Sequence, residues 1–509
     1  MIRFKLVTSV IGYLIHGFVI MMFIPLIAAF LLKQYDSAFA FAATIILSMA
    51  LGRLAINADR KAKFDDLNRI ESMGVVSFGW LVLSILGTIP YMYFGLNFID
   101  AFFESMSGFT TTGSTILSDF SAINSSMFFY RGFTQWIGGL GILVIFVALL
   151  PQLAIAGRQL FFAEVSAESK DKLSPRIKDT AGQLLAWYAF LTIFCTVALC
   201  FSGMDLATAA TNAFSTIAAA GFSSQDTSIA GFHNPAAEWV IIIFMFLAGA
   251  NFILQVRAAK SFLDYLKYRN IESKRAKFKN LIASSFKGLF TNTELMAYTA
   301  IIAVASIAIC FILAYHMPDT SISEIVRQSL FQCISIITTT GCASVDYELW
   351  PMAAKSILII LMFIGGCSGS AGGGMKVIRI VILVKYFWKM LLKNIYPEAV
   401  IRIKLDNRTV RENDVQPILT FFMCYMALFL IGGTILCTIE NSLVEGYSGA
   451  IACLGNTGPG FRAIGPMGNF GHWHALSKLV AIVLMWAGRL EVMALVIFLR
   501  PEAWHRSRW

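Results

Sequence analysis

Residues 108–115 read "GFTTTGST" in a chain otherwise crowded with leucine, isoleucine, phenylalanine and alanine. Three successive threonines followed by glycine make a poor helix, because β-branched side chains disfavour the helix and glycine weakens it further. Comparable stretches recur as "IAAAGFSS" (217–224), "ITTTGCAS" (337–344) and "LGNTGPGF" (454–461). We call these four stretches the TG motifs. Helix-breaking stretches beside long apolar segments need a structural reason, and that reason decides the fold.

The composition is that of a protein that crosses a membrane several times. Of the 509 residues, 57% are hydrophobic and 14% are charged, and the mean hydropathy is +0.71, whereas soluble proteins have about 25% charged residues. Apolar runs of about 20 residues, the length that crosses a hydrocarbon core, recur along the chain. The first, 6–32, is too long for a signal peptide and is expected to be retained. The nine cysteines are scattered without a CxxC pair, so neither a disulfide framework nor a zinc site is predicted.

The net charge of +10 is concentrated in the segments 53–69, 158–178, 257–287 and 376–411. By contrast, 96–130 and 203–240 contain no lysine or arginine. Because basic segments face the cytoplasm, both termini are predicted to be cytoplasmic, and the TG motifs face the outside or dip in from it. Topology accounts for the charge, so no nucleic-acid binding is predicted.

The same order of parts surrounds each TG motif, which indicates a four-fold internal repeat. The motif glycines at 113, 221, 341 and 458 are separated by 108, 120 and 117 residues. Each unit reads apolar span, short amphipathic segment, TG motif, second apolar span. Helix-start signals precede the short segments at Asp100, Asp205, "SISE" (321–324) and "SLVE" (442–445). The first spans are predicted at 73–95, 183–202, 295–315 and 417–438, and the second spans at 128–150, 237–256, 353–383 and 477–499.

This arrangement predicts a pore for cations. Bare backbone is tolerated at membrane depth only where protein buries it or where it lines an aqueous path. Four short helices that end at the TG motifs can surround one axis, with C-termini that each carry roughly half a negative charge. Glycine adopts positive φ, so successive carbonyls can point at that axis. Such a ring of carbonyls replaces the hydration shell of an ion, as in potassium-selective filters.

Longer stretches around the motifs carry a family resemblance. They read "SMSGFTTTGSTI", "NAFSTIAAAGFSS", "SIITTTGCASVD" and "LGNTGPGF", followed by "QWIGGLGILV", "FIGGCSGSAGGGMKVIR" and "MWAGRLE". With these stretches the chain resembles, over essentially its whole length, the superfamily of Trk, Ktr and plant HKT potassium transporters, and most of all its bacterial TrkH and TrkG members. The resemblance implies potassium uptake in the bacterial cell inner membrane, K⁺ as the transported ion, no organic cofactor and no enzyme activity.

The resemblance also implies the fold class and the divisions of the chain. We expect an all-α polytopic membrane protein with four fused M1–P–M2 repeats, similar to those of K⁺ channels, around a central pore, plus two N-terminal transmembrane helices. The divisions are a two-helix N-terminal addition (1–70), repeat 1 (71–157), repeat 2 (158–257), a basic cytoplasmic segment (258–290), repeat 3 (291–392) and repeat 4 (393–509).

Carried over position by position, the resemblance implies a K⁺ selectivity filter in which twelve residues hold the metal ion: Thr111, Thr112, Gly113, Ala219, Ala220, Gly221, Thr339, Thr340, Gly341, Asn456, Thr457 and Gly458. In this family a filter glycine in every unit goes with K⁺ preference, whereas serine in the first unit is associated with Na⁺ permeation in some plant relatives. The alanines of the second unit and Pro459 depart from a threonine-rich pattern, so carbonyl coordination is expected more than hydroxyl coordination.

Two features below the expected filter suggest a gate. The stretch "GGCSGSAGGG" contains Gly365, Gly366, Gly369, Gly372, Gly373 and Gly374. It lacks the GK[ST] ending of a nucleotide loop, and it fits either close packing of helices through small residues or, as we prefer, a flexible loop under the filter. Arg489 lies within the last span, where an arginine costs roughly 2.5–3.5 kcal/mol. It either pairs with a carboxylate on another helix or, as we prefer, forms an electrostatic barrier in the pore. The resemblance implies gating roles for both features.

Partners and coupling are less constrained. Segment 257–290 has a net charge of +7 and suits anionic lipid headgroups or an acidic protein. The resemblance favours the second, a cytoplasmic nucleotide-binding regulatory subunit similar to TrkA, and it implies a homodimer. Alternating access is disfavoured because the repeats run in one direction, and neither a nucleophile nor a metal cluster points to an enzyme. A K⁺/Na⁺ or H⁺-coupled symporter of the same superfamily stays open as the alternative. Nine acidic residues of the outer segments either concentrate cations at the mouth or are solvated loop charges: Asp100, Glu104, Asp119, Asp205, Asp226, Glu238, Asp319, Asp346 and Glu348.

Overall fold

The structure is a computed structural model that describes residues 3–60, 67–121, 123–148, 173–268, 291–406 and 408–492. Within these ranges the only strands are β1 (Ile403–Leu405) and β2 (Arg408–Val410), which pair antiparallel with Ile403 opposite Val410. Six described helices are long and apolar enough to cross a membrane. The all-α, multi-pass fold class is therefore confirmed, with one short hairpin that the apolar pattern did not predict.

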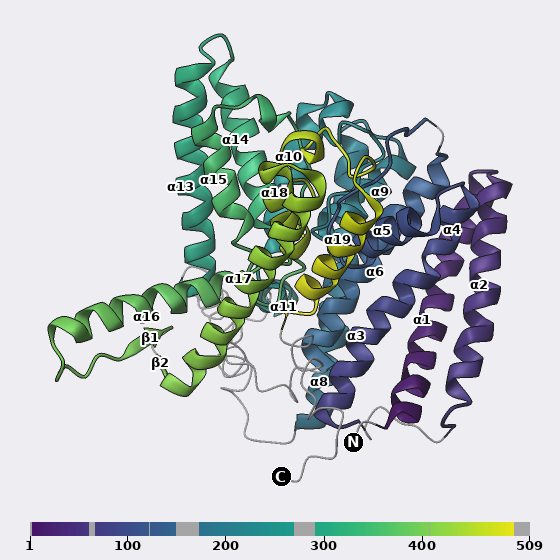
Figure 1. Cartoon of the computed structure of the whole chain (residues 1–509), viewed down its shortest axis with the longest axis horizontal. Helices are drawn as coiled ribbons and strands as arrows, with labels where there is room; N and C mark the ends of the chain where they lie inside the picture. The colour runs from purple at the N-terminus through teal and green to yellow at the C-terminus, as the bar shows by residue number, and fades with distance from the viewer. Residues whose placement is uncertain are drawn as a thin grey trace.

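Two N-terminal helices stand at one edge of the molecule. They are α1 (Phe4–Leu31) and α2 (Tyr35–Ile56), which lie side by side next to α3, while α16 (Val377–Ile395) and the hairpin extend from the opposite edge (Figure 1). The helices α1 and α2 are the two N-terminal transmembrane helices that were expected ahead of the first unit.

A long helix, a short helix, a loop and a second helix then follow one another four times. The elements are α3 (Arg69–Leu86) with α4 (Thr88–Tyr93), α5 (Phe98–Phe109) and α6 (Ser125–Ala148) in the first unit; α8 (Leu173–Phe201), α9 (Leu206–Ile217) and α10 (Pro235–Gly249) in the second; α13 (Thr293–His316), α14 (Ile322–Ile337) and α15 (Met352–Met362) in the third; and α17 (Glu412–Glu440), α18 (Leu443–Leu454) and α19 (Ala475–Arg489) in the fourth. Single 3-10 turns occur in the outer loops at Ala230–Phe232, Tyr347–Leu349 and Arg462–Ile464.

The second spans do not all continue as straight helices, which corrects the prediction. In the second unit α10 stops at Gly249, and α11 (Phe252–Tyr268) leaves at 104° to it. A Cβ at Gly249 would meet the Thr338 side chain, and the Asn251 side chain caps α11 by accepting from the Ile253 N–H at 2.9 Å. In the fourth unit α19 ends at Arg489, and Glu491 and Val492 turn with positive φ (54° and 51°); the rest of the expected span, 493–499, lies outside the described residues.

Three of the four expected helix starts are confirmed. Side-chain oxygens of Asp205, Ser321 and Ser442 each accept the backbone N–H three residues on, which satisfies an otherwise unpaired donor of the first turn. The expectation for Asp100 is wrong, because Asn97 is the N-cap and its side chain accepts from the Asp100 N–H at 3.0 Å. Asparagine is as good an N-cap as aspartate, and Asn97 precedes Asp100 in the chain.

The four short helices occupy the interior of the molecule. In α5 every residue from Ala101 to Phe109 is buried, and the last residues of α9, α14 and α18 are buried as well. The surrounding long helices supply the apolar packing and leave the helix C-termini inside the protein, where the TG motifs begin.

Candidate functional site

All four short helices end in the same backbone turn. After α5, the Thr112 N–H bonds to the Ser107 carbonyl at 2.9 Å and the Thr111 N–H to the Gly108 carbonyl at 3.0 Å. This pair of bonds is the Schellman motif, which needs a left-handed residue just past the helix. Equivalent outer bonds close α9, α14 and α18: Ala220 to Ser215 at 3.0 Å, Thr340 to Ser335 at 2.9 Å and Thr457 to Ala452 at 2.8 Å. The four TG motifs therefore start from one shared geometry.

The left-handed residue of each turn is not glycine. The φ angles are 53° at Thr111, 54° at Ala219, 58° at Thr339 and 54° at Asn456. A non-glycine residue in this region costs about 1–2 kcal/mol, and such strain persists where the surrounding structure enforces it, often at functional sites. Two residues on, each motif glycine again has positive φ, between 77° and 100°. Positive φ at alternate residues turns successive carbonyls toward one side, unlike an ordinary strand.

The motif glycines close a ring in the order of the chain. A Cβ added at Gly113 would run into the carbonyl oxygen of Ala220, the residue before the next motif glycine. In the same way, Gly221 faces the Thr340 carbonyl, Gly341 faces the Thr457 carbonyl, and Gly458 faces the Thr112 carbonyl. Unit 1 thus meets unit 2, unit 2 meets unit 3, unit 3 meets unit 4, and unit 4 returns to unit 1. Four segments more than 340 residues apart at their extremes surround one axis.

Side-chain oxygens at this ring are of two kinds. The hydroxyls of Thr112 and Thr340 turn back to those of Thr110 and Thr338, at 2.8 and 2.7 Å. By contrast, among the described residues no hydrogen-bond partner exists for three buried oxygens: Thr111 Oγ1, Asn456 Oδ1 and Thr457 Oγ1. Buried polar atoms usually have a partner, so these oxygens are available to a bound cation or to water.

On the outer side of the ring, the four motif glycines line one side of a cavity of about 50 Å³, which we call the outer cavity. Its walls come from the segments that follow the motifs, including the side chains of Arg131 and Asp226. The α6 residue Gln135 reaches the ring from behind: its Nε2 donates to the Ala220 carbonyl at 2.8 Å and its Oε1 accepts from the Phe222 N–H at 3.2 Å. The second unit, which has alanines in its motif, is thereby fixed by a side chain of the first.

On the inner side of the ring, the glycine-rich stretch 365–374 contacts residues of more than one unit. The Gly373 N–H donates to Thr339 Oγ1 at 2.6 Å, and a Cβ at Gly373 would meet the Gly455 carbonyl and the Asn456 side chain. From the same loop, the N–H groups of Cys367 and Ala371 bond to the carbonyls of Gly249 and Ala248 in unit 2, at 2.8 and 3.1 Å. A loop so placed covers the inner side of the ring.

The other expected gating glycines belong to this loop. The Gly365 N–H bonds to the Met375 carbonyl at 2.8 Å, and the Gly366 carbonyl accepts from the Val377 N–H at 3.2 Å, so the two ends of the loop pair. The Gly369 carbonyl accepts from the Phe252 N–H at 3.1 Å. The Gly372 carbonyl accepts from Lys376 Nζ, and Gly374 has a φ of 63°. In these hydrogen bonds each glycine contributes a backbone group, and a Cβ at Gly365, Gly366 or Gly372 would meet a neighbouring atom within 3 Å.

Arg489 fastens the loop to the first unit. Its two terminal nitrogens donate to the Ala371 carbonyl at 3.2 Å and to the Gly138 carbonyl of α6 at 3.1 Å, and the residue is 3% exposed. No carboxylate pairs with it among the described residues, because its neighbour Glu491 pairs with Arg379. Arg489, the residue expected to form a barrier, therefore joins the loop to α6, and we call this pair of hydrogen bonds the Arg489 clamp. Its positive charge lies beside the loop and next to α6.

The sequence reasoning missed several residues that hold these parts in place. Buried Glu294 on α13 accepts from the N–H groups of Ser368 and Ile378, at 2.7 and 3.2 Å, and so fixes both ends of the loop. Its signal was a carboxylate at the start of a transmembrane span, which is costly unless satisfied. Gln135 gave a similar signal as a polar residue within an apolar span.

Four of the nine acidic residues of the outer segments are ion-paired, so these four do not form a free acidic mouth. Glu104 is buried against Arg131 at 2.7 Å, Glu238 pairs with Arg327 at 2.8 Å, Glu348 with Lys355 at 3.3 Å, and Asp100 with Lys478 at 2.6 Å. The cations come from the helices that flank the loops, so the absence of basic residues in the loops themselves gave the wrong impression. Of the nine acidic residues, Asp226 lines the outer cavity.

Comparisons with known proteins agree with this architecture. The family model TrkH, described as a cation transport protein, matches residues 37–506. The chain is 33% identical over 506 residues to the Trk system potassium uptake protein TrkH of Escherichia coli strain K12, covering 99% of both chains. It is 30% identical to TrkG of the same strain, with 98% of both covered. The crystal structure of the potassium transporter TrkH from Vibrio parahaemolyticus matches with a TM-score of 0.86 at 31% identity, covering 99% of this chain and 100% of that one.

Proposed function

Since the chain belongs to the TrkH family of cation transport proteins, we propose that it takes up K⁺ through one pore on the axis of its four TG motifs. The observation that carries this proposal is the cyclic contact of each motif glycine with a carbonyl of the next unit. Main-chain oxygens arranged around one axis can replace the water that an alkali ion loses on entering a filter.

In this proposal the twelve motif residues form the K⁺ selectivity filter. The carbonyls supply the coordinating oxygens, and the C-termini of α5, α9, α14 and α18 add a negative potential of roughly half a charge each. The unpartnered oxygens of Thr111, Asn456 and Thr457 extend the coordination at the inner end. A glycine in each unit keeps the neighbouring carbonyl in place, since any Cβ would displace it.

The glycine-rich loop and Arg489 form the gate. The loop spans the inner side of the ring through bonds to units 2 and 3, and Arg489 ties it to unit 1. Movement of the loop requires these hydrogen bonds to break, while the arginine charge opposes a cation that passes close to it. Closure of the path by the loop and its release by a regulatory partner account for controlled uptake.

We place the regulatory partner and both termini on the cytoplasmic side of a bacterial inner membrane. The basic segment 258–290, most of which lies outside the described residues, is the proposed contact for a nucleotide-binding subunit similar to TrkA. Two copies of the chain are proposed to assemble as a homodimer, each with its own pore.

Uptake of ⁸⁶Rb⁺ into vesicles that contain the purified full-length chain tests the function. K⁺ is expected to compete with ⁸⁶Rb⁺ at concentrations at which Na⁺ and a large organic cation do not. Gly113→Ser is expected to weaken this discrimination, because the new Cβ overlaps the Ala220 carbonyl. The matched control is Gly203→Ser, whose φ is also positive (102°, against 86° at Gly113) but which has no described atom within 4 Å of its Cβ. Unchanged discrimination in Gly113→Ser would refute the filter assignment.

The same vesicles separate passive flux from coupled uptake. A reversal potential that follows the K⁺ gradient alone, at any imposed pH or Na⁺ gradient, supports a pore. A reversal potential that moves with the pH or Na⁺ gradient supports the symport alternative, and it leaves the filter test unaffected.

A further inference from the structure

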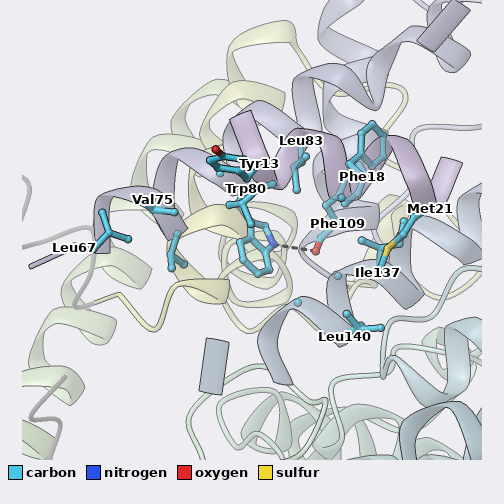
Figure 2. Close-up of a pocket in the computed structure, with 16 residues that line it drawn as sticks. Tyr13, Phe18, Met21, Leu67, Val75, Trp80, Leu83, Phe109, Ile137 and Leu140 are labelled. Atoms are coloured by element: carbon cyan, nitrogen blue, oxygen red, sulfur yellow. Dashed lines mark hydrogen bonds between the residues drawn. The ribbon is translucent and has the colours of Figure 1, made fainter. Parts of the chain in front are cut away.

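An apolar cavity of about 330 Å³ lies behind the first TG motif. It is enclosed by α1, α3 and α6, and its lining includes Tyr13, Gly17, Trp80, Leu83 and Phe109 (Figure 2). This volume is within the ~300–1,000 Å³ range of small-molecule sites. An apolar occupant of this space would gain dispersion contacts with its walls.

The lining offers almost nothing to a polar ligand. Its side chains are aliphatic or aromatic, and the indole N–H of Trp80 is already used, because it donates to the Phe109 carbonyl at 3.1 Å (Figure 2). Among the described residues that line the cavity, none is charged. An occupant with a charge or with several hydrogen-bonding groups would be desolvated here without compensation.

The cavity opens at membrane depth. Tyr13 and Gly17, one turn apart on α1, are the exposed residues of the lining. The helix α1 is long and apolar enough to span the bilayer, so its exposed face meets hydrocarbon. The lining runs from Tyr13 to Met21 on α1 and from Val75 to Leu83 on α3, which is about 12 Å along each helix. An elongated slot of this kind suits a linear hydrocarbon.

One end of the slot lies where a lipid headgroup would be. Leu67, which lines it, lies two residues before Arg69, the first residue of α3, and in the first turn of α3 Glu71 pairs with Arg3 at 2.7 Å. The Arg3 side chain is still 54% exposed, and Lys5 in the first turn of α1 is exposed too. Basic groups near this end of an apolar slot complement a phosphate attached to an acyl chain.

We propose that this cavity binds an acyl chain of a membrane phospholipid, with the phosphate toward Arg3 and Lys5. The chain end then packs against Phe109, the last residue of α5, and against Gly138, whose carbonyl accepts from Arg489. The bound lipid supports the backbone behind the first TG motif and the site at which the Arg489 clamp attaches.

The test is photolabelling of the full-length chain in phospholipid vesicles that contain phosphatidylcholine with a diazirine at the end of one acyl chain. Peptide mapping is expected to show label on Trp80 and Leu83, inside the cavity, as well as on Ile20, which is 70% exposed on α1. Gly17→Leu fills the cavity from a position whose Cβ meets no described atom within 4 Å. It is expected to reduce the label on Trp80 and Leu83 at least fivefold and to leave that on Ile20 unchanged.

The matched control is Gly182→Leu on α8, another exposed helical glycine with open space around its Cβ, which should label as the parent does. Gly79→Leu fills the cavity from α3, where the nearest described atom is the mobile end of Leu14 at 3.2 Å, and should act as Gly17→Leu does. Label on Ile20 alone in the parent, or label on Trp80 and Leu83 that neither filling variant reduces, would overturn the proposal. No readout here depends on K⁺ transport, so a failure would not bear on the pore.

Discussion

Replacement of Thr339 by valine isolates the bond that joins the loop to the TG motifs. Thr339 Oγ1 accepts from the Gly373 N–H at 2.6 Å, and both residues are buried. Valine keeps the shape and the β-branching, so the strain of the left-handed backbone, with φ at 58°, is unchanged. The substitution leaves a buried N–H without an acceptor, which costs about 1–3 kcal/mol. Because the loss applies only while the loop is closed, the ratio of closed to open loop should fall about 5–150-fold.

Thr111→Val is the matched control for this prediction. Thr111 occupies the equivalent position in the first unit, with φ at 53°, and its hydroxyl has no partner among the described residues. It loses the same hydroxyl near the axis without releasing the loop. Initial ⁸⁶Rb⁺ uptake into vesicles, measured without a regulatory partner, should rise at least about fivefold in Thr339→Val and should not rise in Thr111→Val. Equal changes in the two variants would refute the coupling of loop and motif.

Three further perturbations test the gate and its frame. Arg489→Ala removes a positive charge and two hydrogen bonds to backbone carbonyls, so uptake of ⁸⁶Rb⁺ should be faster, and an unaltered rate would contradict its role. Deletion of residues 369–373 removes the middle of the loop and should raise flux, whereas ordinary gating in the shortened chain would show that the loop is not the gate. Arg131→Met leaves Glu104 buried without its cation, which costs about 3–5 kcal/mol, so the variant should unfold at a lower temperature. The added substitution Glu104→Leu should restore part of the lost stability. An Arg131→Met variant as stable as the parent would argue against a structural ion pair.

The architecture could be predicted because its signals are local and repeated. The spans follow from apolar runs of membrane length, and three short-helix starts follow from capping residues at Asp205, Ser321 and Ser442. The failure at Asp100 has the same physics, since the rival cap Asn97 stood three residues earlier. A single capping pattern does not establish a helix start, but its recurrence at equivalent places in the units made the prediction of the short helices possible.

Contacts between elements that lie far apart in the chain could not be predicted from such signals. Gln135 supports the second motif from α6, and Glu294 holds the loop from α13. Both are polar residues in apolar surroundings, which indicates that a partner exists but not which one. The breaks near Gly249 and Arg489 escaped detection for a related reason: the helix ends where a neighbouring backbone approaches, and a hydropathy pattern contains no information about neighbours.

The left-handed residues show where the glycine argument was incomplete. The sequence indicates positive φ at the motif glycines, and the structure has it there. It also has positive φ two residues earlier, at Thr111 and its equivalents, none of which is glycine. Glycine is required at the later position because a Cβ would strike the next unit's carbonyl. At the earlier position a side chain is accommodated despite the strain, and at Thr111 and Asn456 it has an oxygen without a partner among the described residues.

A second set of contacts follows the order of the glycine ring on its outer side, and each junction uses different chemistry. The Arg131 guanidinium donates to the Ser223 carbonyl between units 1 and 2, and Glu238 pairs with Arg327 between units 2 and 3. Glu348, itself paired with Lys355, accepts from the Arg462 N–H between units 3 and 4, and Lys478 pairs with Asp100 between units 4 and 1. A ring of four identical subunits would repeat one junction four times, and one substitution would alter all of them. Because a single chain provides four distinct junctions, a substitution can loosen one side of the ring while three remain intact. The loop, which bonds to units 2 and 3 and is clamped to unit 1 by Arg489, therefore acts on a ring that is already unequal around its axis.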